Sequence, residues 1–300
     1  PLIGLATLSG VSASFWHPPA ISMLSTRFPG RKGMAIAFHG SGSGAGEALG
    51  PIVVGFILVT WLSDDWRLYT VLSFIPAVFL ALILYWLLVG AKNPEPEAPA
   101  TRPARVRDTL ALLRYPVYVS LAYANFTRSF SHFGMLNFMP VYLAQDLGMD
   151  SFGVGLHVSL LTLLGVAVGP LLGYFSDRIG RRLPIVASMV VVGLSMFVMG
   201  AAGSGIMLTL SLAFAGLFLW SSQDIINAAA MDAAPPGLQG STVALMFLSS
   251  LVGATVGVIV IGFVIGLTDS YRSMFWLAGA FITPSMFIFL FAPLQRDKQA

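Results

Sequence analysis

Long apolar runs separated by short polar segments form the dominant pattern along this chain. Each run is as long as, or longer than, the ~20 residues that an α-helix needs to cross the hydrocarbon layer of a membrane. The pattern therefore predicts an all-α polytopic membrane protein with nine transmembrane helices. The predicted spans are 2–26, 33–62, 68–89, 117–145, 151–176, 183–202, 206–230, 239–267 and 272–293.

The segment between the third and fourth predicted spans differs from the other connections. It is rich in Pro and charged residues at first, which favours an extended and solvated linker. It ends in an amphipathic stretch, 106–113, flanked by arginines, which we expect to lie along the membrane surface. We expect a tether between two helical bundles. The predicted division is 1–89 for the remainder of a first bundle, 90–116 for the linker, 117–293 for a six-helix bundle and 294–300 for a tail.

Composition supports the membrane assignment and excludes several other classes. The chain is 56% hydrophobic and only 10% charged, whereas a soluble domain has about 25% charged residues. The net charge is only +3 and the basic residues lie in short loops, which does not favour nucleic-acid binding. There is no cysteine and the four histidines are scattered, so we expect no disulfide, metal site or cofactor.

The distribution of basic residues predicts the orientation of the chain. With the spans above, thirteen Lys and Arg residues fall on one side of the membrane and two, Arg67 and Arg272, on the other. Short cytoplasmic loops carry the excess of basic residues in membrane proteins. The linker, the 177–182 loop and the C-terminus are therefore predicted to be cytoplasmic, in what we expect to be a bacterial inner membrane.

The loop after the fifth predicted span carries a recognisable motif. Residues 173–182 read Gly-x-x-x-Asp-Arg-x-Gly-Arg-Arg, and Gly180 permits a tight turn between two membrane helices. This resembles the loop signature of the major facilitator superfamily of secondary transporters. The resemblance implies two helical bundles that rock around a central site, with the Asp and Arg of the loop latching one state across the bundle interface. The implied latch residues are Gly173, Asp177, Arg178, Gly180, Arg181 and Arg182.

Three spans, a cytoplasmic linker and six spans resemble helices 4–12 of a twelve-helix transporter of that superfamily. At a shift of 207 residues, Pro29 falls on Pro236, and glycines 33, 46, 50 and 55 fall on glycines 240, 253, 257 and 262. Such correspondence is expected of two repeated halves. We therefore expect the chain to be a fragment that lacks the first three helices.

The second predicted span carries glycines at i, i+4 and i+8. Gly42, Gly46 and Gly50, followed by Pro51, present a surface on which another helix can approach closely. Gly46-x-x-x-Gly50-Pro51 resembles the fifth-helix signature of antiporter members of the superfamily. With the His17-Pro18 pair upstream, the region also resembles the fosmidomycin-resistance type and related drug or organic-solute branches. The alternative is a helix-packing face and no more.

Ionisable residues within predicted spans are costly unless they are paired or wetted, so they mark candidate sites. Arg128 and His132 lie at i and i+4 on one helix face, with Asn125 one turn earlier. This face is predicted to contact an anion or carboxylate. The alternative is that Arg128 pairs structurally with Glu47 or Asp224. The further cavity residues that we predict are Gln223, Asn227 and Trp16.

Two carboxylates and one histidine are candidates for proton coupling. Burial in a low-dielectric environment favours the neutral form of a carboxylic acid, which could then exchange protons as the cavity alternates between the two sides. We rank Asp224 and Glu47 first and His17 third, since an imidazole titrates near neutral pH.

These features favour a monomeric, proton-coupled secondary transporter that exports a small drug-like or organic solute across the lipid bilayer. The alternative within the superfamily is uptake of an organic anion such as a monocarboxylate, with Arg128 as counter-ion. From other classes, a non-transporting membrane sensor would need a signalling domain. A membrane enzyme would need a nucleophile–base pair or a metal cluster, and the sequence indicates neither.

Overall fold

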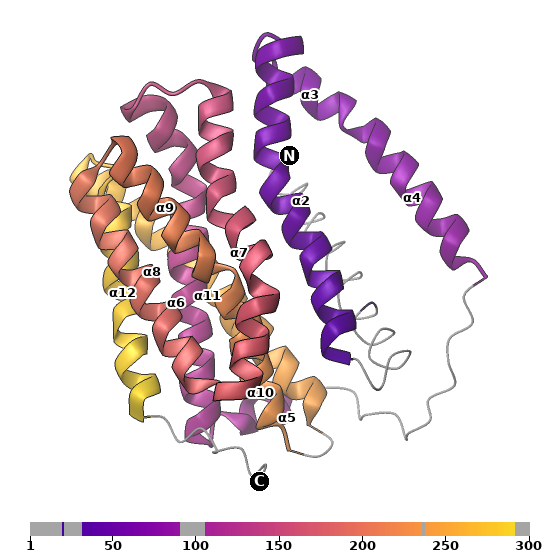
Figure 1. Cartoon of the computed structure of the whole chain (residues 1–300), viewed down its shortest axis with the longest axis vertical. Coiled ribbons are helices and arrows are strands. Elements are labelled where there is room, and N and C mark those ends of the chain that lie inside the picture. The colour runs from indigo at the N-terminus through magenta and orange to yellow at the C-terminus, as the bar shows by residue number, and fades with distance from the viewer. Residues whose placement is uncertain (1–19, 21–31, 91–105, 236–237, 292–300) are drawn as a thin grey trace. The chain divides into compact units, whose positions relative to one another are not determined.

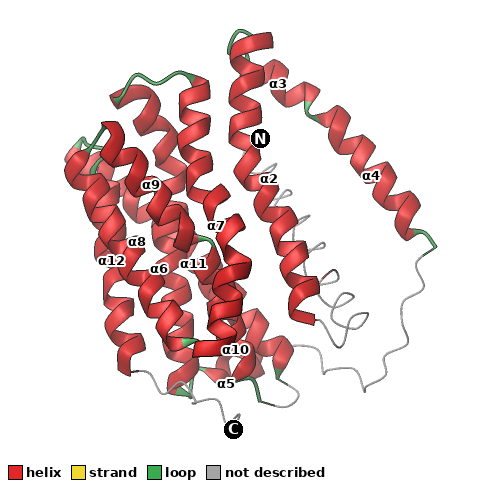
Figure 2. Ribbon diagram, in the orientation of Figure 1, coloured by secondary structure: helices red, strands yellow, loops and turns green. Residues whose placement is uncertain are grey.

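The computed structural model describes residue 20 and residues 32–90, 106–235 and 238–291, and all of its regular elements are helices (Figures 1 and 2). By length and hydropathy, six helices in this part of the chain can cross a membrane. They cover His39–Trp61, Trp66–Leu88, Ser151–Ile179, Arg182–Ala202, Gly205–Asp232 and Gly240–Thr268. The prediction of an all-α polytopic membrane protein is confirmed. The first predicted span, 2–26, lies outside the described residues, apart from Ala20.

The chain divides into two units. One joins Pro1–Ser43 with Arg67–Ala100, and the other joins Gly44–Trp66 with Thr101–Ala300. Of the first unit, the structure describes the start of α2 (Lys32–Trp61), most of α3 (Trp66–Leu72) and α4 (Phe74–Leu88). The second unit holds the remainder of α2 and every helix from α5 onwards.

The helices of the second unit follow the predicted spans closely. Their bounds are α5 (Val106–Leu112), α6 (Pro116–Val141) with a π-helical end (Tyr142–Asp146), α7 (Ser151–Ile179), α8 (Arg182–Ala202), α9 (Gly205–Leu219), α10 (Ser221–Asp232), α11 (Gln239–Thr268) and α12 (Ser273–Phe291). Local chemistry sets several boundaries. The Asp150 carboxylate accepts the amide hydrogen of Gly153 at 2.7 Å and caps α7, and Pro116 begins α6.

Two predicted single spans are each divided into two helices. The 68–89 span is interrupted at Ser73, whose hydroxyl donates to the Thr70 carbonyl oxygen at 2.7 Å. Such local bonding competes with the regular helical ladder. The 206–230 span is interrupted at Trp220, between α9 and α10. Sequence hydropathy does not detect these breaks, because each span as a whole is long and apolar enough to cross a membrane.

Helix α6 is the central helix of the second unit, and it packs most extensively against α11 and also against α12 (Figure 1). It is 26 residues long but is not among the six most apolar spans, because it carries a run of polar side chains. These side chains are buried, and hydrogen bonds satisfy most of them. Asn125 donates to the Met246 carbonyl oxygen on α11 at 2.6 Å, and Ser131 donates to that of Ala278 on α12 at 2.8 Å.

Glycines allow α6 and α11 to approach at backbone distance. A methyl group on Gly253 or Gly257 of α11 would overlap the backbone of Phe126 or Phe130 on α6. On α2, close approach occurs at Gly44, at Gly55 and at the Pro51 backbone, which meets Gly155 of α7. No described residue lies within 4 Å of a Cβ at Gly42, Gly46 or Gly50. The packing face predicted for Gly42, Gly46 and Gly50 therefore stays a prediction, whereas Gly253 and Gly257 of α11 are in close backbone contact.

Candidate functional site: a buried arginine and a charged helix turn

Arg128 lies near the middle of α6 and is the most deeply buried charge of the described chain, with 3% of its surface exposed. Its Nη1 donates to the Leu219 carbonyl oxygen at 3.1 Å, and its Nη2 donates to the Ser129 hydroxyl at 2.9 Å. The Nε hydrogen has no partner among the described residues. The guanidinium is therefore anchored through Nη1 and Nη2, while its Nε–H is left for a further acceptor.

The break between α9 and α10 provides the main anchor for this arginine. Leu219 is the last residue of α9, and its carbonyl oxygen also accepts a hydrogen bond from the Ser222 hydroxyl at 3.1 Å. The end of a helix carries exposed carbonyl groups and a partial negative charge, which attracts a cation. A discontinuous helix thus supplies acceptors for a guanidinium in the middle of a predicted membrane span, where water is scarce.

His132 follows Arg128 by one helical turn and is also buried, with 1% of its surface exposed. Neither of its ring nitrogens has a hydrogen-bond partner among the described residues. Its ring meets the Trp220 ring edge-on, with centroids 6.1 Å apart. A buried and unpaired polar group is costly, so His132 is a candidate to bind a ligand.

The two predicted carboxylates lie in the electrostatic field of Arg128 without a direct ion pair. Asp224 on α10 and Glu47 on α2 both interact with the guanidinium through their charges. No carboxylate of the described residues forms an ion pair with Arg128 within 4 Å, in contrast to Arg181, which pairs with Asp177 and Asp232. The alternative that a direct pair fully neutralises Arg128 is therefore not observed.

The remaining predicted cavity residues take different positions. Gln223 and Asn227 lie one turn apart on α10 and bond to each other at 3.2 Å, which leaves Gln223 Oε1 unpartnered. The amide of Asn125 donates to α11, with a second contact to Ser249 at 3.3 Å, so it joins two helices. The predictions for Trp16 and His17 lie outside the described residues. Sequence reasoning missed the break at Trp220, although the polar residues that follow it directly, Ser221 to Asp224, are a usable signal.

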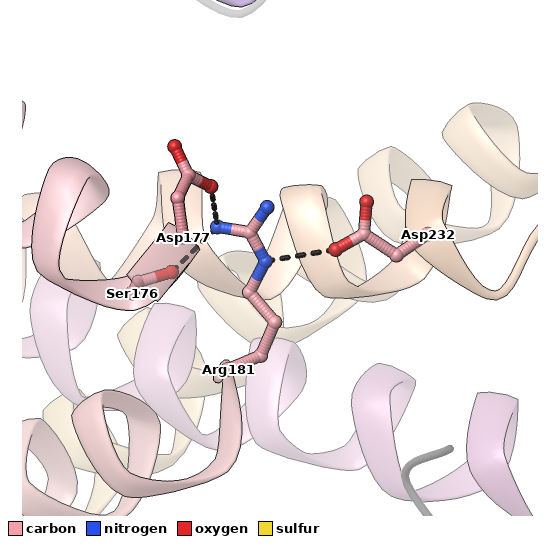
Figure 3. A network of polar contacts seen from close by, with 4 residues as sticks. All are labelled: Ser176, Asp177, Arg181 and Asp232. Atoms are coloured by element: carbon pink, nitrogen blue, oxygen red, sulfur yellow. Dashed lines mark hydrogen bonds and ion pairs between the residues drawn. The ribbon is translucent and has the colours of Figure 1, made fainter. Parts of the chain in front are cut away.

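The loop motif forms a second polar site, at the turn between α7 and α8 (Figure 3). Arg181 pairs with Asp177 at 2.5 Å and with Asp232 at 2.8 Å, and its Nη1 donates to the Ser176 hydroxyl at 2.6 Å. Partial burial alone would lower the pKa of Arg181, but the bond to Asp232 and the charges of Asp232 and Asp177 outweigh it. The pKa therefore lies above its ordinary value. This turn brings together the ends of α7 and α10.

Other residues of the motif shape the same turn. Gly180 has φ 88° and ψ 156°, a conformation open almost only to glycine. The Arg178 guanidinium lies over the Tyr174 ring, 4.4 Å from its centroid. No described atom lies within 4 Å of a Cβ on Gly173, and Arg182 begins α8. Sequence reasoning missed Asp232, although an acidic residue at the end of a span facing an arginine-rich loop is a usable signal.

Comparisons with known proteins identify the relationship. The family model of the Major Facilitator Superfamily matches residues 1–250 and 121–300. The chain belongs to the major facilitator superfamily. It is 26% identical to the hexuronate transporter of Bacillus subtilis over 88% of this chain, and 26% identical to human monocarboxylate transporter 11 over 97% of it. The chain spans 63% of the length of each of these two relatives.

Solved structures agree on the superfamily fold. A bacterial homologue of the human lysosomal transporter Spinster, in an inward-facing and occupied conformation, matches 91% of this chain and 72% of its own, with TM-score 0.65 and 15% identity. The fucose:proton symporter of E. coli matches 89% of this chain and 69% of its own, with TM-score 0.62 and 14% identity. The superfamily resemblance inferred from residues 173–182 is thereby confirmed.

Proposed function

We propose that this superfamily member is a proton-coupled secondary transporter of small organic solutes that carry a carboxylate group, with Arg128 as the counter-ion. The observation that carries the proposal is the buried guanidinium whose Nε has no partner and which has no direct ion pair among the described residues. A carboxylate bound there would complete its hydrogen bonding, and charge-assisted bonds of this kind are the strong ones. His132 would donate to or accept from the same solute.

The relatives support this proposal, since three of them are named for acids. Besides the hexuronate and monocarboxylate transporters, a Salmonella typhimurium protein, 20% identical over 98% of this chain, is named a phosphoglycerate transporter. We propose that Asp224 and Glu47 carry the coupled proton, because each carboxylate interacts with the charge of Arg128. Binding of an anionic solute would then alter the balance of charge around both acids.

Export of a drug-like solute, which the sequence favoured, is the second candidate. A Klebsiella pneumoniae protein named multidrug resistance protein MdtG is 26% identical over 62% of this chain. The Gly46-x-x-x-Gly50-Pro51 resemblance to antiporters points the same way. The carboxylate reading ranks first because it assigns a role to the buried guanidinium, which a hydrophobic drug would leave unpaired.

Our proposal for the architecture keeps the predicted division into 1–89, the 90–116 linker and 117–293. It also keeps the linker and C-terminus on the cytoplasmic side of a bacterial inner membrane, and a monomeric transporter without enzymatic activity. We propose that the protein works by alternating access and that the ion pairs of Arg181 with Asp177 and Asp232 stabilise one of its two conformational states. The ion pair between Arg181 and Asp232, at the end of α10, supports including Asp232 in this proposed switch.

Transport assays on the full-length protein in proteoliposomes test this proposal. A hexuronate, a monocarboxylate, a neutral hexose and a cationic dye are each added, while solute movement and lumenal pH are followed. We expect movement of a carboxylate accompanied by a pH change. Arg128→Lys keeps the charge but loses the planar fork, so transport should fall sharply. Thr255→Ala, at an exposed position of α11 whose hydroxyl bonds only to the Leu251 carbonyl oxygen of the same helix, is the control.

A separate measurement tests whether Asp224 and Glu47 carry the coupled proton. Asp224→Asn or Glu47→Gln should abolish the pH change, while equilibrium exchange of labelled solute continues. If the cationic dye is the only solute that moves, and if it moves equally well in Arg128→Lys, the carboxylate proposal is wrong and drug export is favoured. If solute moves in the wild type without a pH change, transport is not coupled to protons and neither acid has a coupling role.

A further inference from the structure

Helix α5 (Val106–Leu112) docks on the second unit through one side only. Leu112 is completely buried and Thr109 nearly so, and the helix packs against α11. The Tyr118 hydroxyl just beyond it donates to the Ala233 carbonyl oxygen at 2.6 Å and fixes the start of α6 to the end of α10. The position of α5 at this end of the bundle is therefore set by packing (Figure 1).

The side of α5 that does not dock is apolar. Val106 is 76% exposed, and Leu110 and Leu113 are also exposed. At 100° per residue, these three side chains fall within about 60° of one another around the helix. Tyr115, which follows, is exposed as well. An exposed apolar ridge of this kind needs an apolar environment.

Two exposed arginines border this ridge. Arg107 and Arg114 are seven residues apart, which places them on one side of the helix. The chain keeps winding through 113–115, since the amides of Leu113, Arg114 and Tyr115 each bond to the carbonyl three residues earlier. The α5 face thus consists of an apolar ridge with a basic edge.

Chain length places this face close to the membrane surface. Only three residues, 113–115, separate α5 from the first residue of α6. Three residues span at most about 11 Å, and the headgroup region is about 5–8 Å thick on each side of the hydrocarbon. The ridge therefore lies within reach of the interface where α6 enters the membrane.

We propose that the α5 face (Val106, Arg107, Leu110, Leu113, Arg114 and Tyr115) is a binding surface for anionic phospholipid. The apolar ridge would enter the boundary between headgroups and acyl chains, as in interfacial amphipathic helices. Arg107 and Arg114 would contact lipid phosphates, and Tyr115 would lie at headgroup level. Because α5 is packed on α11, bound lipid would stabilise the position of α11 and, through it, of α6.

Binding of labelled lipid to the purified full-length protein in detergent tests this proposal. Fluorescent phosphatidylglycerol and phosphatidylcholine are titrated separately, and energy transfer from tryptophan reports binding. Each arginine near an anionic surface contributes roughly fivefold to affinity. Arg107→Gln with Arg114→Gln should therefore weaken phosphatidylglycerol binding roughly 30-fold, with phosphatidylcholine binding unchanged. Lys92→Gln with Arg102→Gln removes the same charge from the linker and should leave both affinities unchanged.

Two further measurements identify the ligand. Leu110→Ser should also weaken phosphatidylglycerol binding, because the ridge is part of the surface, and glycerol phosphate at millimolar concentration should not compete. Equal weakening by both double variants, no effect of Arg107→Gln with Arg114→Gln, or full competition by glycerol phosphate would each overturn the proposal. Thermal unfolding of every variant, expected within 2 °C of wild type for exposed positions, confirms that the fold is intact.

Discussion

Substitutions at the contact between α6 and α11 can test whether this contact holds the helix of the buried arginine, Arg128, in place. Gly257 of α11 lies against the backbone of Phe130, two residues after Arg128. Gly134 of α6 faces the same spot, and a Cβ there would lie 3.0 Å from the Gly257 carbonyl carbon. We predict that Gly257→Ala destabilises the protein and also impairs transport, because the new methyl group must push α6 away.

The size of the effect follows from two opposing contributions. Alanine is favoured over glycine within a helix by about 1 kcal/mol. Overpacking in a close-packed interior costs about 1–3 kcal/mol, and a backbone carbonyl cannot rotate aside as a flexible side chain can. At the high end of this range the net loss is about 2 kcal/mol, which corresponds to a decrease in melting temperature of roughly 4–8 °C for a domain of this size.

Gly266→Ala on the same helix is the matched control, because no described atom lies within 4 Å of its Cβ. It should be neutral or slightly stabilising. Melting temperatures in detergent and initial transport rates in proteoliposomes are measured for both variants. Equal melting temperatures and equal transport rates in the two variants would refute the argument that backbone contact at Gly257 holds α6 in place.

Three other sites give further predictions. Asp177→Asn and Asp232→Asn should each slow transport while membrane insertion stays normal. Because both carboxylates are exposed, the free energy of unfolding should fall by less than about 1 kcal/mol. Unaltered transport rates would exclude a latch role. Gly180→Ala should cost about 1–3 kcal/mol because of its φ of 88°, seen as a lower melting temperature, and no shift would contradict it. The Ser151 hydroxyl donates to Asp64 at 2.7 Å, so cysteines at both positions, joined by a short thiol cross-linker, should block transport reversibly if α2 and α7 separate there during the cycle. Full activity after cross-linking would show that they do not.

Much of the molecule was predictable from sequence because membrane helices depend on local properties. Hydropathy and length predicted α2 and the helices from α6 to α12, apart from breaks at Ser73 and Trp220. The Gly-x-x-x-Asp-Arg-x-Gly-Arg-Arg motif indicated the superfamily, because a tight charged turn needs particular residues at fixed spacing. The i, i+4 relation of Arg128 and His132 also follows from helical period alone.

Tertiary structure decided which polar groups meet. The sequence offered two carboxylates as partners for Arg128, but the guanidinium bonds to the Leu219 carbonyl and to Ser129. Close backbone contact between helices, which the sequence did not locate, occurs where Gly253 and Gly257 of α11 meet Phe126 and Phe130 of α6. Asp232, 51 residues after Arg181, completes the charged turn.

Membrane class and helix positions follow from sequence alone, since the cost of exposing backbone groups to lipid constrains every span in the same way. How each buried polar side chain is satisfied depends on the packing of the helices. Hydrogen bonds depend on distances of a fraction of an ångström between helices far apart in the chain. A carbonyl freed by a break at Trp220, which no periodicity reveals, can therefore determine the surroundings of the central arginine.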